Sequence, residues 1–223
     1  MYIGYCGVEI IHNIKKFLDP GGVFIDVGAG IGYFSAIASD IVGITGQVHC
    51  FEPCPQNVKA IQKMLKSHPE SNIVLNDFAL GLDNSIHEFH IKREYNTTKV
   101  SMNENIINPK EASEIITVKT QRLDNYLEEK ELSKISLIKV DVEGYELFVL
   151  KGLSTFFEKT RNKPPIFCEI DPNAYKEKDA SLLDLYKYMK NYGYQAFNIF
   201  NSNVATDIRK LSDITDIVFR IVK

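Results

Sequence analysis

The segment 23–35, with the sequence VFIDVGAGIGYFS, constrains the fold more than any other part of the chain. Apolar residues, three of them β-branched, surround Asp26, glycines occupy alternate positions from Gly28 to Gly32, and a helix-like segment follows. This order predicts a buried strand, a tight glycine turn and a helix that begins directly after the turn. Such a turn lets a ligand approach the backbone, and the helix N-terminus offers unpaired N–H groups. We therefore expect a nucleotide-type ligand here.

The spacing of the three glycines separates two classes of nucleotide cofactor. A dinucleotide fingerprint requires the pattern Gly-x-Gly-x-x-Gly. Here Tyr33 or Ser35 stands at the third glycine position, depending on which glycine begins the pattern, and this disfavours a nicotinamide dinucleotide. The pattern from Asp26 is Asp-x-Gly-x-Gly-x-Gly, which resembles the first motif of Rossmann-like methyltransferases that use S-adenosylmethionine (AdoMet).

Length and composition limit the class of protein. The 223 residues predict a single domain over residues 1–223, with an N-terminal helix within residues 1–20. A net charge of −3 and the lack of a basic run disfavour nucleic acid as a partner. No apolar run approaches the roughly 18 residues of a membrane-spanning helix, and the N-terminus lacks the basic start of a signal peptide. We therefore expect a cytoplasmic protein without a membrane segment, whose oligomeric state the sequence does not indicate.

The four cysteines do not have the spacing of a metal site. Cys50 and Cys54 are separated by three residues, and no matching Cys/His pair follows them. We expect all four to be reduced thiols that pack as small apolar side chains.

Strand-like and helix-like segments alternate along most of the chain. Helices are expected over residues 8–18, 33–41, 55–66, 143–150 and 182–191, and strands over 23–27, 47–51, 73–75, 135–140, 166–170, 194–200 and 217–222. Alternation of this kind predicts an α/β fold with a mostly parallel, seven-stranded sheet and helices on both faces. The last two strands are joined by a polar loop, which predicts an antiparallel C-terminal hairpin.

One region, residues 85–120, interrupts the alternation. Its flanks, Ser85–Ile91 and Ile115–Thr120, alternate in polarity like strands, whereas residues 92–114 are mostly polar. We interpret the region as a β-hairpin insertion near the mouth of the site. A loop of this length is usually functional or disordered, so it is either a flap over the substrate or a loop of no fixed role.

An acidic residue lies at or just past the end of each of the first three predicted strands, at the sheet edge where α/β proteins bind ligands. Asp26 is placed to accept a hydrogen bond from the AdoMet ammonium, directly or through water, and Glu52 to accept from both ribose hydroxyls. Asp77 is placed to accept from the adenine amine. Each acid could instead be a solvated loop carboxylate. The expected cofactor-binding residues are Asp26, Gly28, Gly30, Gly32, Glu52, Asp77 and Asp141.

A second block, residues 138–152, places three acids after a buried strand. Asp141 at the strand tip would face the sulfonium end of the pocket. Glu143 and Glu146 are three positions apart and are therefore expected on one face of a helix that begins near Glu143. These acids could instead cap the helix, with Asp141 as the N-cap and both glutamates in the first turn.

Together, these motifs make the chain similar to the FkbM family of AdoMet-dependent methyltransferases. The matching segments are Asp26–Tyr33, Phe51–Pro53, Leu123–Asp124, Lys139–Glu146, Leu150–Gly152 and Glu169. The resemblance implies a class I methyltransferase fold, AdoMet as cofactor, S-adenosylhomocysteine (AdoHcy) as product, and a small-molecule or glycan hydroxyl as acceptor. The sequence departs from the family at Gly30, where asparagine is usual, and in its short segment before the first strand.

Methyl transfer requires an aligned nucleophile and removal of its proton. We expect Asp141 to serve as the base or as the anchor of the acceptor hydroxyl, with Glu143 or Glu169 as the neighbour that tunes it. No metal is assigned, although a divalent ion shared by Asp141 and Glu169 is a minor possibility. The sequence also leaves open the methylation of an amine, an NAD(P)-dependent oxidoreductase, and a non-catalytic AdoMet-binding protein.

Overall fold

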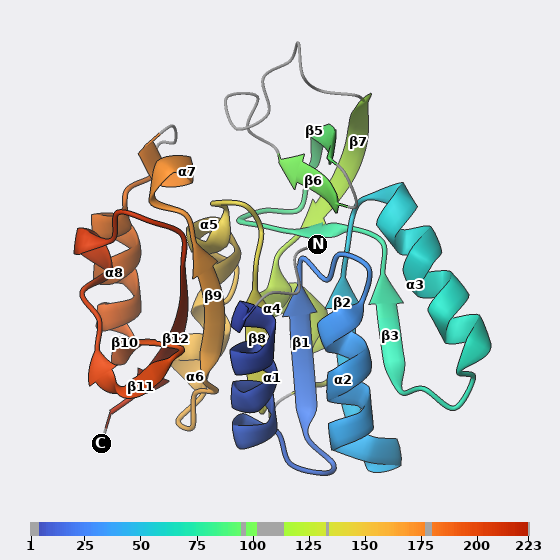
Figure 1. Ribbon diagram of the computed structural model, residues 1–223, viewed down its shortest axis with the longest axis horizontal. Helices are drawn as coiled ribbons and strands as arrows, with labels where there is room; N and C mark the ends of the chain where they lie inside the picture. Colours follow the sequence, from blue (N-terminus) through green and yellow to red (C-terminus); the bar gives the residue numbers. More distant parts are fainter. Residues whose placement is uncertain (1–4, 95–96, 102–113, 133, 177–179, 223) are drawn as a thin grey trace.

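The computed structural model describes residues 5–94, 97–101, 114–132, 134–176 and 180–222. Its centre is an eight-stranded sheet in the order β11-β10-β12-β9-β8-β1-β2-β3 (Figure 1). The strands are β1 (Val23–Val27), β2 (Gln47–Phe51), β3 (Ile73–Asn76), β8 (Leu137–Val140), β9 (Ile166–Ile170), β10 (Tyr194–Asn198), β11 (Asn201–Ala205) and β12 (Thr215–Ile221). The five neighbouring strands β9, β8, β1, β2 and β3 are parallel to one another. Strand β12 runs antiparallel to both β9 and β10.

This arrangement confirms the predicted α/β fold with a mostly parallel sheet and an antiparallel C-terminal pair. The prediction of seven strands missed β11, which pairs with β10 at the edge of the sheet. Its sequence, Asn-Ser-Asn-Val-Ala, begins with residues that are typical of turns, so neither alternation nor β propensity marks it as a strand.

Helices cover both faces of the sheet. On one face lie α1 (Tyr5–Phe17), α2 (Tyr33–Val42) and α3 (Pro55–Ser67), and the first two are in front of the sheet in Figure 1. The opposite face packs against α4 (Leu123–Glu129), α5 (Glu146–Lys151), α6 (Ser154–Lys159) and α8 (Leu182–Asn191). The short helix α7 (Pro172–Lys176) follows β9, and single 3₁₀ turns lie at Gly43–Thr45 and Ile208–Lys210.

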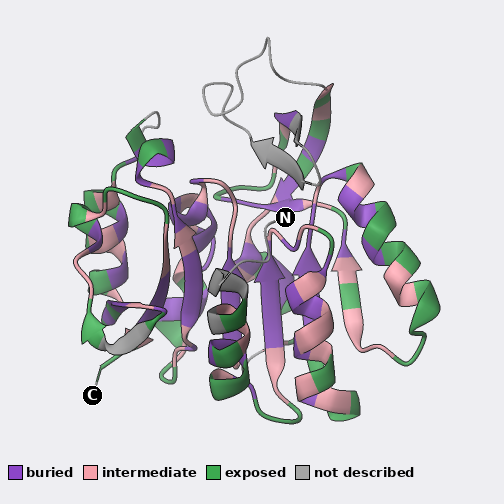
Figure 2. Ribbon diagram, viewed as in Figure 1, coloured by how far each residue is buried: buried purple, intermediate pink, exposed green. Residues whose placement is uncertain are grey.

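The central strands are buried on both faces, as their continuous apolar sequences predict (Figure 2). All four residues of β8 are buried, and so are the last four of β1 and of β2. Lys139 differs from the apolar residues of β8, because it is charged and yet only 5% exposed. A buried lysine requires anionic or polar partners, and these lie at the candidate site.

The predicted insertion is present, with more strand than expected. It forms a small sheet in the order β4-β7-β5-β6, above the carboxyl ends of the main strands in Figure 1. Its strands are β4 (Ala79–Leu80), β5 (Ile86–Glu94), β6 (Thr97–Ser101) and β7 (Glu114–Gln121). The expected end of the first flanking strand at Ile91 is wrong, because β5 continues into the polar stretch to Glu94 and pairs with β6. Residues 102–113 lie outside the described residues.

Within the described ranges, no helix combines the length and the apolar character needed to cross a membrane.

A close backbone contact fixes the base of the insertion to the main domain. A Cβ added to Gly152, at the end of α5, would lie 2.4 Å from the carbonyl oxygen of Gly81, at the end of β4. Gly152 has ordinary right-handed helical backbone angles, so proximity rather than conformation requires glycine there. At Gly81, by contrast, an added Cβ would meet the Thr120 side chain at 3.9 Å, an ordinary contact.

We expect Gly152→Ala to lower the free energy of unfolding by about 1–3 kcal/mol, because the new methyl group overlaps backbone that has little room to move. Gly81→Ala, on the other side of the same contact, is the matched control and should change it by less than about 0.5 kcal/mol. Urea denaturation followed by circular dichroism measures both. Equal effects of the two substitutions would contradict this assignment of the contact.

Candidate functional site

The glycine turn after β1 contacts the end of β8, and its glycines have different surroundings. All three have positive φ values, between 57° and 83°. A Cβ added to Gly28 would lie 1.9 Å from the carbonyl oxygen of Asp141, and one added to Gly32 would lie 3.1 Å from Ile61 on α3. At Gly30, no atom of the described residues other than its own and those of its two chain neighbours lies within 4 Å of that position. Of the three glycines, only Gly30 borders open space on the side where a Cβ would lie, whereas Gly28 and Gly32 are required by close packing. The approach of a ligand to all three stays a prediction.

Glu52, directly after β2, accepts two backbone hydrogen bonds. Its Oε2 accepts from Gly30 N at 2.7 Å, and its Oε1 accepts from Cys54 N at 2.9 Å. Burial raises the pKa of this carboxyl to about 7, although both N–H groups act in the opposite direction. Glu52 thus links the open position of the glycine turn to the end of β2, as the sequence placed it.

Asp26 is completely buried. Its Oδ2 accepts from Ser35 Oγ on α2 at 2.6 Å, and its Oδ1 forms an ion pair with Lys139 Nζ at 3.4 Å. A fully buried carboxylate cannot touch a ligand directly. In this structure Asp26 contacts Ser35 and Lys139, and its expected hydrogen bond with an ammonium group, directly or through water, stays a prediction.

Lys139 joins the two halves of the site. Its ammonium lies 3.4 Å from Asp26 Oδ1 and 3.2 Å from Asp141 Oδ2, and it donates to Gly28 O at 3.3 Å. The ring of Phe34 on α2 lies 5.5 Å away on the same face of the sheet. Burial alone would lower the pKa of Lys139, but Asp141 and Asp26 outweigh it and raise that pKa, so the ammonium stays charged.

The turn between β8 and α5 differs from the predicted helix start. Helix α5 begins at Glu146 rather than Glu143, because Glu143 and Gly144 both adopt left-handed backbone angles. Glu143 and Glu146 therefore do not share a helical face. Glu146 is buried and its Oε1 accepts from Gly144 N at 2.9 Å and Val142 N at 3.3 Å, so it stabilises the turn itself.

Three carboxylates lie in a row across the carboxyl ends of β8 and β9 and the amino end of the antiparallel strand β12. Val140 pairs with Cys168, which places Asp141 beside Glu169, and Glu169 pairs with Asp216. Asp141, followed by burial, Asp216 and Glu143, raises the pKa of Glu169 to about 8. Burial and Asp141 raise the pKa of Asp216 to about 6. Asp216 was not foreseen, because only the antiparallel register of β12 on β9 brings it to this edge.

The remaining predicted residue, Asp77, lies in the turn between β3 and β4 with an exposed side chain. Its neighbour Phe78 is half-buried and packs edge-on against Phe51 at 5.5 Å. Phe51 itself belongs to the core and is 1% exposed, so it is not available as a ligand surface. If Asp77 contacts adenine, Phe78 and the turn that holds both residues would have to form that part of the site.

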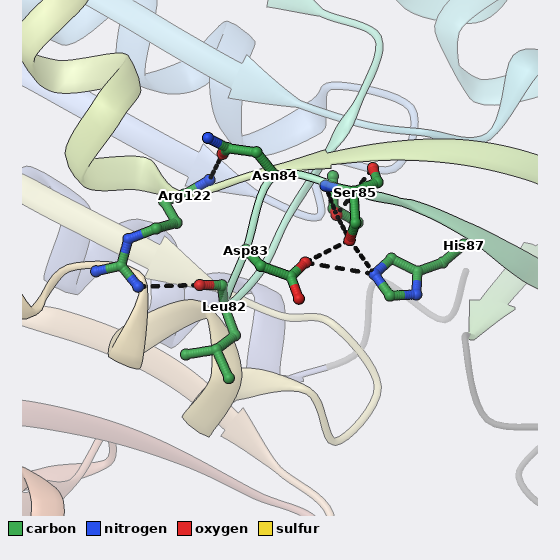
Figure 3. Close-up of polar contacts among 7 residues, drawn as sticks. Leu82, Asp83, Asn84, Ser85, His87 and Arg122 are labelled. Atoms are coloured by element: carbon green, nitrogen blue, oxygen red, sulfur yellow. Dashed lines mark hydrogen bonds and ion pairs between the residues drawn. The ribbon is translucent and has the colours of Figure 1, made fainter.

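The base of the insertion carries a cluster of polar contacts, shown in Figure 3. Ser85 Oγ bonds both Asp83 and His87, and Arg122 donates to Leu82 O at 2.9 Å. The same ring nitrogen of His87 faces Ser85 and Asp83, whereas a hydrolytic triad uses opposite ring nitrogens for its two partners. This cluster therefore organises the loop and does not form a nucleophile.

The family-like residues Leu123 and Asp124 also have a structural role. Asp124 accepts from the backbone N–H groups of Thr155 and Phe156 at the start of α6, and it forms an ion pair with Arg122 at 2.8 Å. Leu123 is fully buried in the core.

The described parts of the chain hold no group of three or more His, Cys, Asp or Glu side chains that is arranged to bind a metal ion. Asp141, one of the two candidate ligands, already faces the Lys139 ammonium.

The residues present fit an AdoMet-type cofactor at the ends of β1 and β2. Gly30 leaves its backbone accessible to a cofactor, and its N–H donates a hydrogen bond to the carboxylate of Glu52. The family model described as Methyltransferase FkbM domain matches residues 26–196 of this chain. The chain belongs to the FkbM methyltransferase family. This match runs from the end of β1 into β10 and so includes each of the candidate carboxylates except Asp216.

Two curated relatives are methyltransferases. The chain is 29% identical over 168 residues to methyltransferase 1 of Beauveria bassiana, covering 66% of this chain and 67% of the relative. It is 29% identical over 146 residues to the hexuronic acid methyltransferase AglP of Haloferax volcanii, covering 66% of this chain and 56% of the relative. This FkbM chain thus spans little more than half the length of the archaeal relative.

The fold is similar to that of a solved FkbM methyltransferase from Methylobacillus flagellatus. The TM-score is 0.58 at 17% identity, over 96% of this chain and 51% of the solved one. Together with the sheet order, this likeness confirms the class I Rossmann-like methyltransferase fold.

We expect Glu146→Ala to lower the free energy of unfolding by about 3 kcal/mol or more. It would leave the buried N–H of Gly144, the partly buried N–H of Val142 and the Tyr175 hydroxyl, which donates to Glu146 Oε2 at 2.9 Å, without their acceptor. Tyr175→Phe removes only the third of these bonds and should cost about 1–2 kcal/mol. Thermal and urea unfolding measure both variants. A Glu146→Ala effect no larger than that of Tyr175→Phe would contradict the role of Glu146 in the turn.

Proposed function

We propose that this FkbM protein is an AdoMet-dependent methyltransferase that methylates a hydroxyl of a sugar, a glycan or a secondary metabolite. The observation that carries the proposal is the pairing of Glu52 with Gly30 N beside an open glycine position, with Asp141 and Glu169 on the neighbouring strands. A cofactor cradle and a pair of carboxylates thus share one edge of the sheet.

In this proposal, Glu52 accepts hydrogen bonds from the two ribose hydroxyls, because its two oxygens match two donors. Gly30 lets the cofactor approach the backbone, and Asp77 accepts from the adenine amine. Asp26 holds Ser35 and Lys139 in place from beneath the pocket. AdoMet supplies an electrophilic methyl group when it is bound.

The acceptor side is proposed to lie at Asp141 and Glu169. Asp141 is 34% exposed in its side chain and is held by Lys139, so it presents a fixed carboxylate at the strand end. Carboxylates accept hydrogen bonds and protons from hydroxyl groups, which suits an alcohol acceptor. The hexuronic acid methyltransferase among the relatives supports a carbohydrate as the acceptor class.

The first prediction concerns Glu52 and distinguishes cofactor classes. Calorimetry should detect binding of AdoMet and AdoHcy, and no binding of NAD. Because the pKa of Glu52 is raised to about 7, the carboxylate form is lost below this pH, and affinity for both ligands should fall about tenfold from pH 8 to pH 6. Glu52→Gln should bind weakly and lose this pH dependence.

The control is Glu158→Gln on the exposed surface of α6, which should retain both affinity and pH dependence. Binding of NAD alone would favour an oxidoreductase and overturn the proposal.

The second prediction concerns turnover. With AdoMet and a panel of neutral and uronic monosaccharides, AdoHcy formation should reveal a hydroxyl acceptor. Asp141→Asn should lower turnover about a hundredfold or more while AdoMet affinity changes little, because the acceptor loses a fixed carboxylate. An unchanged rate would remove Asp141 from the mechanism. AdoMet binding without turnover on any hydroxyl or amine acceptor would favour a non-catalytic AdoMet-binding protein.

A further inference from the structure

The two carboxylates at the ends of β8 and β9 face different partners. Asp141 Oδ2 lies 3.2 Å from the buried ammonium of Lys139. Glu169 lies between Asp141 on one side and Asp216 on the other, as the strand register requires. One carboxylate is thus paired with a cation, and the other is placed mainly among anions.

The Lys139 ammonium already has three oxygen neighbours. It forms ion pairs with Asp26 Oδ1 at 3.4 Å and Asp141 Oδ2 at 3.2 Å, and it donates a hydrogen bond to Gly28 O at 3.3 Å. The stem is buried in β8, so the cation cannot swing toward Glu169 without leaving Asp26 uncompensated. Lys139 therefore stabilises the charge of Asp141 more directly than that of Glu169.

Four charged groups face Glu169. Asp141 at the end of β8, Asp216 on β12 and Glu143 in the turn before α5 raise its pKa, as does burial, and Lys139 on β8 acts in the opposite direction. The resulting pKa of about 8 means that Glu169 gains and loses its proton near neutral pH, which is the range in which a general base is most effective.

We propose that Lys139 gives these two carboxylates different roles. Its ammonium holds Asp141 as a charged anchor for the acceptor hydroxyl, and Glu169 takes the acceptor's proton. This inference rests on the proposed methyltransferase function. The proton moves from the acceptor oxygen to the Glu169 carboxylate as the oxygen–carbon bond forms. The carbon–sulfur bond breaks and its electron pair stays on the sulfur, which becomes a neutral thioether. Lys139 is a positioning residue in this scheme.

The test compares the protons released when the full chain binds AdoMet and AdoHcy, which differ in the positive charge at sulfur. Titration calorimetry in phosphate and in Tris gives the proton count for each ligand. Near pH 7.5, the cationic ligand should favour ionised Glu169 and release about half a proton more than AdoHcy, if it lowers the pKa of Glu169 by about one unit. Ionisation of Glu52 is common to both ligands and cancels in the difference.

Paired variants identify the titrating group. Glu169→Gln should abolish the difference at every pH from about 6 to 9. Asp141→Asn should move the difference to lower pH, because Asp141 raises the pKa of Glu169, and Lys139→Gln should move it to higher pH, because Lys139 lowers that pKa. Glu158→Gln on the exposed surface of α6 should match the parent protein.

Opposite results overturn the inference. A difference that persists in Glu169→Gln would assign the titrating group to another carboxylate of the row, Asp141 or Asp216, and a difference that Asp141→Asn abolishes at every pH would assign it to Asp141. Because these two variants alone decide the question, the test does not depend on the folding of Lys139→Gln. Equal proton counts for the two ligands in the parent protein would reject the inference alone, whereas failure to bind either ligand would reject the proposed function.

Discussion

The rest of the site depends on the ion pairs of the buried Lys139 ammonium with Asp26 and Asp141. A lysine in the middle of a fully buried strand is stable only with anionic partners, and it has them on both sides. Asp26 on β1 lies opposite Lys139 in the strand register, and Asp141 directly follows the end of β8. One cation therefore ties the strand that feeds the glycine turn to the strand that ends in the candidate catalytic acid.

The same region shows how close packing, rather than ligand contact, accounts for much of the family-like sequence. Gly28 lets the turn after β1 touch the backbone of Asp141, and Gly152 lets α5 touch the backbone of Gly81. Glu146 satisfies the turn between β8 and α5. These residues hold the positions of Asp141 and of the insertion, whereas Glu52, Gly30 and the row of carboxylates form the proposed site.

Sequence periodicity and the glycine spacing were enough to predict the α/β fold, the C-terminal hairpin and the place of Glu52. They could not predict features that depend on backbone conformation or register. Glu143 looked helical because its spacing to Glu146 is helical, but the left-handed backbone at Glu143 delays the helix. Asp216 looked like a loop acid beside the last strand, and only pairing with Glu169 brings it to the site. Strand β6 could not be recognised from the sequence, because its mostly polar residues lack the alternating apolar positions that mark a strand.

The most direct test of the account is a crystal structure of the full chain with AdoHcy bound. The account predicts that the two ribose hydroxyls donate to Glu52, and that the sulfur faces the side of the pocket formed by Asp141 and Glu169. Lys139 should keep its contacts with Asp26 and Asp141. A ribose bound away from Glu52, or a sulfur directed away from Asp141 and Glu169, would contradict it.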